Sequence, residues 1–225
     1  MAKGSAFDEQ YQPKEALEYF LPAEKLEPNN VELLIRIARQ YRHLMSDTSA
    51  KKEKLRLGYI SLGFAQRAAE LAPKNSEAQL SPAISYGKML PYMSGKDQVN
   101  ASPRIKTAVD RTLQLDPDND TAWHILGRWN RVLANVGGVK RVLAKALYGE
   151  LPATTNEAAE KCLLKAIALN PNRLMHYVEL GRLYAQMGRK EEARKNIQKA
   201  LAMPNKDHDD PEMKEIGQEL LKKLG

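Results

Sequence analysis

The sequence predicts an all-α protein, a right-handed α-α superhelix in which helix pairs stack as a solenoid and one further helix caps the C-terminal end. Ala, Leu and charged residues recur at the 3.6-residue period of a helix, and no convincing alternating strand pattern interrupts them. Prolines recur just beyond the helical segments, at Pro28, Pro73, Pro117 and Pro171, where each would stop the helix behind it. Together, the helical period and the regularly placed stops indicate a repeat architecture.

Polar residues after these prolines mark where the next helices could begin. Asn30, Asp120 and Asn172 each lie where a side-chain oxygen could cap the helix that follows. Asp210 stands before Pro211 and resembles an N-cap followed by proline at the first helical position. We therefore expect helices to begin at these points.

The last full repeat is the clearest. Residues 174–203 resemble the tetratricopeptide repeat, whose period is about 34 residues. Its signature positions are occupied by Tyr177, Leu180, Gly181, Tyr184, Gly188, Ala193, Ile197 and Ala200. Small residues at these positions allow two antiparallel helices to approach closely, and the large ones fill the space between them.

Aligning the prolines extends this register to the whole chain. It predicts one domain over residues 1–225, with repeats at about 1–30, 31–75, 76–119, 120–173 and 174–207 and a capping helix at about 210–224. The first repeat would start before Met1, so its first helix is expected to be truncated. Repeats two, three and four exceed the basic period, and their extra residues fall between their two helices at 46–56, 90–103 and 132–156. Pro82 lies within the first helix of repeat three, where we expect a kink or a late start.

Three segments, residues 15–44, 120–136 and 146–172, resemble the regulator of microtubule dynamics family. This resemblance implies a helical-repeat domain. Some family members associate with microtubules, and others associate with mitochondrial membranes and lipid exchange. Animal members often carry an N-terminal membrane anchor, and we expect none ahead of the first repeat here.

Basic residues recur at the positions that line the concave groove of such repeats. They are Arg39, Arg42, His43, Lys88, His124, Arg128, Arg131 and Arg182. Residues three apart share a helix face, so Arg39 with Arg42, and Arg128 with Arg131, form two doublets. Guanidinium groups bind carboxylates bidentately, which predicts a binding scaffold for an acidic peptide or protein tail. Alternatively, these arginines pair with acidic residues of neighbouring second helices or solubilise the surface.

Residues 131–153 suggest a second basic surface. Apolar side chains and basic side chains alternate there as on an amphipathic helix, at Val136, Val139, Lys140, Arg141, Leu143 and Lys145. Such a helix can lie on an anionic phospholipid membrane or dock in a partner's groove, which makes a lipid-binding or lipid-transfer domain the alternative function. A plainer interpretation packs the apolar stripe on the solenoid, and Gly137-Gly138 could break the helix.

Charge and composition narrow the function further. The sequence contains 35 Lys and Arg and 28 Asp and Glu, and the resulting net charge of +7 favours an acidic partner. No nucleic-acid-binding motif accompanies the charge, which makes nucleic acid an unfavoured partner. Cys162 is the single cysteine, and no metal-ligand, phosphate-loop or nucleophile motif is present, so we expect no enzymatic activity and no cofactor. No apolar run approaches the ~18 residues of a membrane span, and we expect a cytoplasmic protein.

Overall fold

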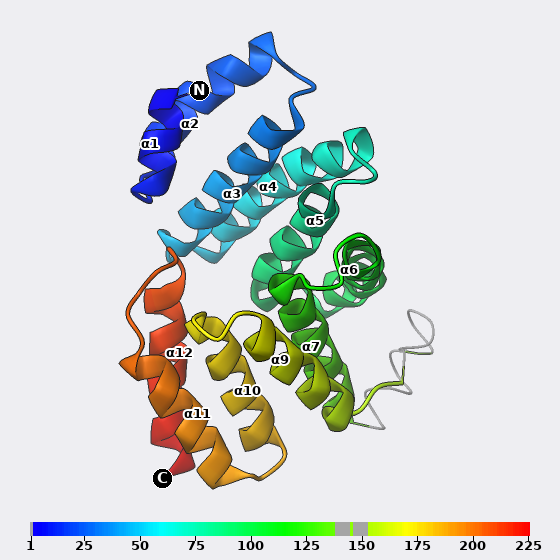
Figure 1. Cartoon of the computed structure of the whole chain (residues 1–225), viewed down its shortest axis with the longest axis vertical. Helices are drawn as coiled ribbons and strands as arrows, with labels where there is room; N and C mark the ends of the chain where they lie inside the picture. Colours follow the sequence, from blue (N-terminus) through cyan, green and yellow to red (C-terminus); the bar gives the residue numbers. More distant parts are fainter. Residues whose placement is uncertain (1, 138–144, 146–152) are drawn as a thin grey trace. The chain divides into compact units, whose positions relative to one another are not determined.

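The computed structural model describes residues 2–137, 145 and 153–225. All regular structure within these residues is helical, which confirms the all-α prediction (Figure 1). The chain divides into two compact units, Met1–Pro117 and Asp118–Gly225, so the boundary falls at one of the prolines that marks a repeat end. Each unit is described separately below. That the whole chain forms one domain stays a prediction.

The first unit consists of three successive helix pairs. Its helices are α1 (Ala2–Glu9), α2 (Pro13–Leu26), α3 (Val31–Ser46), α4 (Lys51–Leu71), α5 (Ser76–Met89), the short 3₁₀ helix η1 (Leu90–Tyr92) and α6 (Gly95–Leu115). Each α-helix packs against the next, and α3 also contacts α5. The extra residues of repeats two and three lengthen α4 and α6. Pro82 does not delay or interrupt α5, which runs through it.

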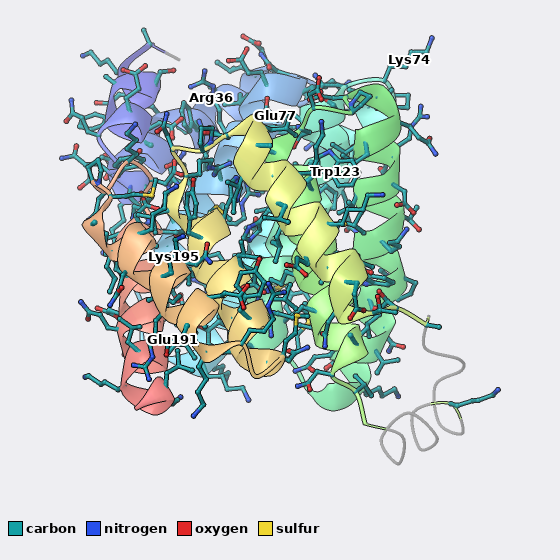
Figure 2. The ribbon with its side chains drawn as sticks, turned by 60° about the horizontal axis from the view of Figure 1, so that its bottom comes forward. Arg36, Lys74, Glu77, Trp123, Glu191 and Lys195 are labelled. Atoms are coloured by element: carbon teal, nitrogen blue, oxygen red, sulfur yellow. The ribbon has the colours of Figure 1, made fainter. Side chains whose placement is uncertain are left out.

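The described residues of the second unit form two helix pairs and the capping helix. Its helices are α7 (Asp120–Ala134), α9 (Asn156–Leu169), α10 (Leu174–Gln186), α11 (Lys190–Ala202) and α12 (Asp210–Leu224). α7 packs on α9, α10 packs on α11, and α12 covers both α10 and α11. Charged side chains such as Glu191 and Lys195 of α11 are exposed to solvent (Figure 2).

Close helix packing in the second unit depends on glycines at signature positions. A Cβ added to Gly127 would lie 2.6 Å from the Cγ of Leu163, and one added to Gly181 would lie 2.6 Å from the Cδ1 of Ile197. Gly188 adopts a φ of 77°, a left-handed conformation that favours glycine, and forms the turn between α10 and α11. These are the roles that the repeat signature predicts.

Asparagine caps recur in both units, although not always at the predicted residue. The Oδ1 atoms of Asn30, Asn75 and Asn119 accept hydrogen bonds from the backbone N–H groups three residues on, at 3.1, 3.0 and 3.0 Å. The predicted cap at Asp120 was wrong by one residue, because Asn119 caps α7 instead. Asn172 does not cap α10, whose N-cap residue is Arg173 and has no side-chain cap.

The residue before Pro211 was also assigned the wrong role. Asp210 does not cap α12, because its Oδ2 accepts hydrogen bonds from the backbone N–H groups of Lys206 at 2.7 Å and Asp207 at 2.9 Å. It therefore closes the turn that precedes the helix.

Residues 131–153 do not form the single amphipathic helix that the sequence predicts, because residues 135–137 are not helical. α7 ends at Ala134, and Val136 lies half-buried in the segment after it. Leu133, at the start of the expected stripe, is buried and belongs to α7. Lys145 is exposed, whereas Val139, Lys140, Arg141 and Leu143 lie outside the described residues. In the described part of the chain, no helix combines the length and apolar character that crossing a membrane requires.

Candidate functional site

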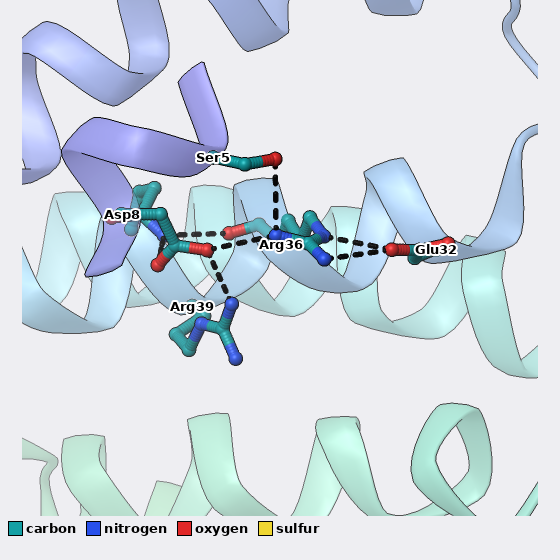
Figure 3. A network of polar contacts seen from close by, with 6 residues as sticks. Ser5, Asp8, Glu32, Arg36 and Arg39 are labelled. Carbon is teal, nitrogen blue, oxygen red and sulfur yellow. Dashed lines mark hydrogen bonds and ion pairs between the residues drawn. The ribbon is translucent and has the colours of Figure 1, made fainter. Parts of the chain in front are cut away.

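Two of the predicted groove residues of the first unit, Arg39 and Arg42, lie on α3 in different environments. Arg39 points toward α1 and forms an ion pair with Asp8, whose side chain is only 5% exposed (Figure 3). The same carboxylate accepts hydrogen bonds from Arg36 at 3.3 Å and from the Nε2 of Gln40 at 2.6 Å. Arg39 thus has an acidic partner within its own unit, but that partner lies on α1, the first helix of its pair, and not on a second helix as the alternative interpretation expected.

Arg42 lies inside the unit. Its side chain is 7% exposed and donates to the hydroxyl groups of Ser81 and Ser85 of α5, at 3.3 and 3.2 Å. Ser85 contacts Ser61 of α4 at 2.9 Å, and the Ser61 hydroxyl donates to the backbone carbonyl of Ala38 at 2.8 Å. Arg42 therefore contributes to a buried polar network that joins α3, α4 and α5, because a buried guanidinium needs such partners.

The two other predicted residues of this unit lie on α3 and α5. The ring of His43 makes an edge-on contact with Tyr11, with centroids 6.1 Å apart. Lys88 is half-buried near the end of α5.

In the second unit, three of the predicted arginines gather around one carboxylate. Glu179 of α10 is 4% exposed and accepts from the Nε of Arg131 at 2.6 Å and from Arg182 at 3.2 Å. Arg131 also donates to the Oε1 of Gln186 at 3.3 Å, and the Gln186 amide donates back to the Arg131 carbonyl at 3.0 Å. These contacts join α7 to α10 and hold the cluster in a fixed geometry.

Arg128 completes this cluster but has no hydrogen bond or ion pair within the described residues. It is half-buried on α7, one turn before Arg131. Burial lowers the pKa of Arg128, the Glu179 carboxylate raises it, and Arg182 and Arg131 lower it further. Three guanidinium groups therefore share one buried carboxylate, and one of the three keeps its donors available.

The ionisation of Glu179 reflects the excess of three guanidinium groups over one carboxylate. Burial would raise the pKa of this carboxyl group, but the charges of Arg131, Arg182 and Arg128 lower it to about 2. Glu179 is therefore ionised at neutral pH, and the cluster keeps a surplus of positive charge. Glu212 of α12 is a more weakly coupled acidic neighbour, since it has the smallest influence on the pKa of Arg128.

His124, the remaining predicted groove residue, lies behind the arginine cluster. Its side chain is 5% exposed, and its Nδ1 lies 3.1 Å from the Nδ1 of His176, which in turn contacts Asp120 at 2.9 Å. Burial, followed by the charge of His176, lowers the pKa of His124 to about 3. At neutral pH this ring is uncharged and acts as a buried link between α7 and α10.

Comparison with known proteins identifies the family of this chain. The sequence model of the family described as "Regulator of microtubule dynamics protein 1-3" matches residues 2–225. The chain belongs to this family. It is 25% identical to regulator of microtubule dynamics protein 1 of Caenorhabditis elegans, covering 85% of this chain and 84% of that protein.

Two mouse members of the family show how the length of relatives varies. Identity to Mus musculus protein 1 is 29%, over 90% of this chain and 67% of that protein. Identity to Mus musculus protein 2 is 26%, over 77% of this chain and 42% of that protein. The chain thus spans less than half of the longer family member.

Solved structures show the fold of this family member. A thermophilic TPR protein of Thermus thermophilus matches 96% of this chain and 95% of its own, with a TM-score of 0.65 and 20% identity. MamA from Desulfovibrio magneticus matches 88% of this chain and 89% of its own, with a TM-score of 0.53 and 14% identity. The chain therefore has a tetratricopeptide-like fold and belongs to the microtubule dynamics regulator family.

The acidic residues that shape the candidate sites were missed by sequence reasoning. Glu179 precedes Arg182 by three residues, a spacing that places the two on one helix face. That signal was available from the sequence for Glu179. Asp8 gave no such signal, because it meets Arg39 from a different helix.

Proposed function

We propose that this regulator-family chain is a non-enzymatic protein-binding scaffold that recognises an acidic peptide or protein tail through Arg128, Arg131 and Arg182. The observation that carries the proposal is the half-buried Arg128 guanidinium, which lacks a hydrogen-bond partner within the described residues beside two arginines that already share Glu179. The wider groove of eight basic residues that the sequence predicts contributes less, since Arg42 and His124 are buried. Arg131 is also buried, and it serves the site by holding Glu179.

Internal ion pairing explains only part of the cluster. Glu179 has two carboxylate oxygens, and Arg131 and Arg182 each donate to one of them. Arg128 makes no hydrogen bond to either of these oxygens within the described residues. An incoming carboxylate would offer its guanidinium two oxygens in a matching planar geometry. Partial burial strengthens such a contact, because water screens it less than at an exposed site.

The test measures binding of a fluorescently labelled glutamate-rich peptide by anisotropy at low salt. Arg128→Gln should weaken binding by about tenfold or more, since it removes a charge-assisted contact at a partly desolvated site. Lys195→Gln is the matched control, because it removes one positive charge from an exposed position on α11. Circular dichroism should show equal helicity for both variants.

Three outcomes would contradict the proposal. Unchanged binding by Arg128→Gln would remove Arg128 from the site, and an equal loss in Lys195→Gln would reduce the effect to net charge. Binding to vesicles of anionic phospholipid, with none to the peptide, would favour the alternative lipid-binding function instead.

A further inference from the structure

In the first unit, a carboxylate of the chain itself lies among the donors of three neighbouring α3 side chains. We propose that Arg36, Arg39 and Gln40 form a second binding site for an acidic peptide segment, and that Asp8 of α1 occupies this site as an intramolecular competitor. The ligand chemistry is the same as in the proposed function, but the inference rests on different residues in the other unit.

The geometry is that of a carboxylate receptor. One oxygen of Asp8 receives donors from Arg36 and Arg39, and the other receives the Nε2 of Gln40 at 2.6 Å (Figure 3). Arg36 also donates to the Ser5 hydroxyl of α1 at 3.3 Å and is held from the other side by Glu32, at 2.8 Å. Three donors converging on one carboxylate are the arrangement by which proteins bind acidic groups.

Asp8 leaves part of this site unsatisfied. The Nε of Arg39 and the Oε1 of Gln40 are buried and have no hydrogen-bond partner within the described residues. Buried polar atoms of this kind favour a ligand that can pair with them. A peptide segment carrying Asp or Glu suits both, since its backbone offers a carbonyl acceptor to Arg39 and an N–H donor to Gln40. The Asp8 carboxylate pairs with neither atom in this geometry, and a carboxylate cannot donate to the Oε1 of Gln40.

α1 is suited to release. It has only eight residues, and helices this short are marginal on their own. The turn that follows contains Tyr11 at a φ of 55°, a left-handed conformation that is unfavourable for a bulky side chain. Short helices with strained connections open at low free energy, which would expose Arg36 and Arg39 without unfolding α3.

Access to the site follows from the exposure of its arginines. The side chains of Arg36 and Arg39 are 26% and 38% exposed even with Asp8 in place. An acidic segment could therefore first contact the exposed edge of Arg39 and then replace Asp8. The apparent affinity would be reduced by the fraction of molecules in which Asp8 still occupies the site.

The experiment uses the full chain in an Arg128→Gln background, which removes the site of the second unit, and the same labelled glutamate-rich peptide. Asp8→Ala should raise the affinity by on the order of tenfold, because the competitor is gone whether α1 stays docked or detaches. Asp110→Ala is the matched control, since Asp110 is a half-exposed aspartate of α6 that pairs with Lys106. Adding Arg39→Gln to Asp8→Ala should abolish the gain.

Either of two results would overturn the inference. Equal affinities for Asp8→Ala and Asp110→Ala would show that Asp8 does not compete. A gain that persists with Arg39→Gln would show that the peptide binds elsewhere. A failure of the proposed function is distinguishable, because Arg128→Gln alone would then leave binding unchanged while the Asp8→Ala gain could still be measured.

Discussion

Replacing Glu179 by Gln tests the electrostatic account of the second unit most directly. The substitution preserves side-chain size but removes the negative charge that Arg128, Arg131 and Arg182 share. These arginines hold the pKa of Glu179 at about 2 rather than 4.5. At about 1.4 kcal/mol per pH unit, this difference corresponds to about 3 kcal/mol of stability at neutral pH. Breaking a buried ion pair typically costs about 3–5 kcal/mol, so the two magnitudes agree.

The assay is urea unfolding at pH 7, followed by circular dichroism at 222 nm. With a slope of about 2 kcal/mol per molar urea, Glu179→Gln should lower the midpoint by about 1.5 M. Glu191→Gln is the control, because the Glu191 side chain is 90% exposed (Figure 2). Its partner, the Nε of Arg194, lies 3.6 Å away, which is a long distance for an ion pair. The midpoint of this control should barely move, since exposed ion pairs contribute little.

The pH dependence gives a second readout with a definite sign. A carboxyl group whose pKa is lowered by folding stabilises the protein fully above its unfolded pKa of 4.5, and this contribution is lost as the pH falls toward about 2. The stability difference between wild type and Glu179→Gln should therefore shrink from about 3 kcal/mol at pH 7 to about 1 kcal/mol at pH 3. A midpoint shift no larger than that of Glu191→Gln would refute the reasoning, as would an equal stability difference at both pH values.

Two further predictions concern packing and protonation. Gly127→Ala should destabilise the protein by about 1–3 kcal/mol in urea unfolding, since the new Cβ would lie 2.6 Å from the Cγ of Leu163. Gly63→Ala, with no atom within 4 Å of the new Cβ, should instead be neutral or stabilising by up to about 1 kcal/mol, and a loss in both would exclude the packing explanation. His124 should stay neutral at pH 5 in nitrogen chemical shifts measured by NMR, because burial lowers its pKa to about 3, and a protonated ring at that pH would contradict the buried assignment.

The architecture follows from local residue preferences that can be identified in the sequence. Proline favours helix ends, and glycines at the signature positions of the repeat are needed where two helices approach closely. The packing role of Gly181 and the turn at Gly188 therefore follow from the repeat signature alone. Capping was less predictable, since neighbouring polar residues compete for one position and a shift of one residue moved the cap of α7 from Asp120 to Asn119.

The sequence by itself determined the all-α, tetratricopeptide-like fold and the recurrence of arginine at predicted groove positions, and its repeat bounds stay a prediction. Only the tertiary structure decided what each arginine contacts. Arg42 is buried among serines, Arg39 is paired with Asp8, and Arg128 is left beside a carboxylate that other arginines already share. The physical reason is that helix periodicity is a local property, whereas the partner of a charge depends on helices that meet it from distant parts of the chain. Arg39 and Arg128 both lie at predicted groove positions on their helices and still have different electrostatic environments.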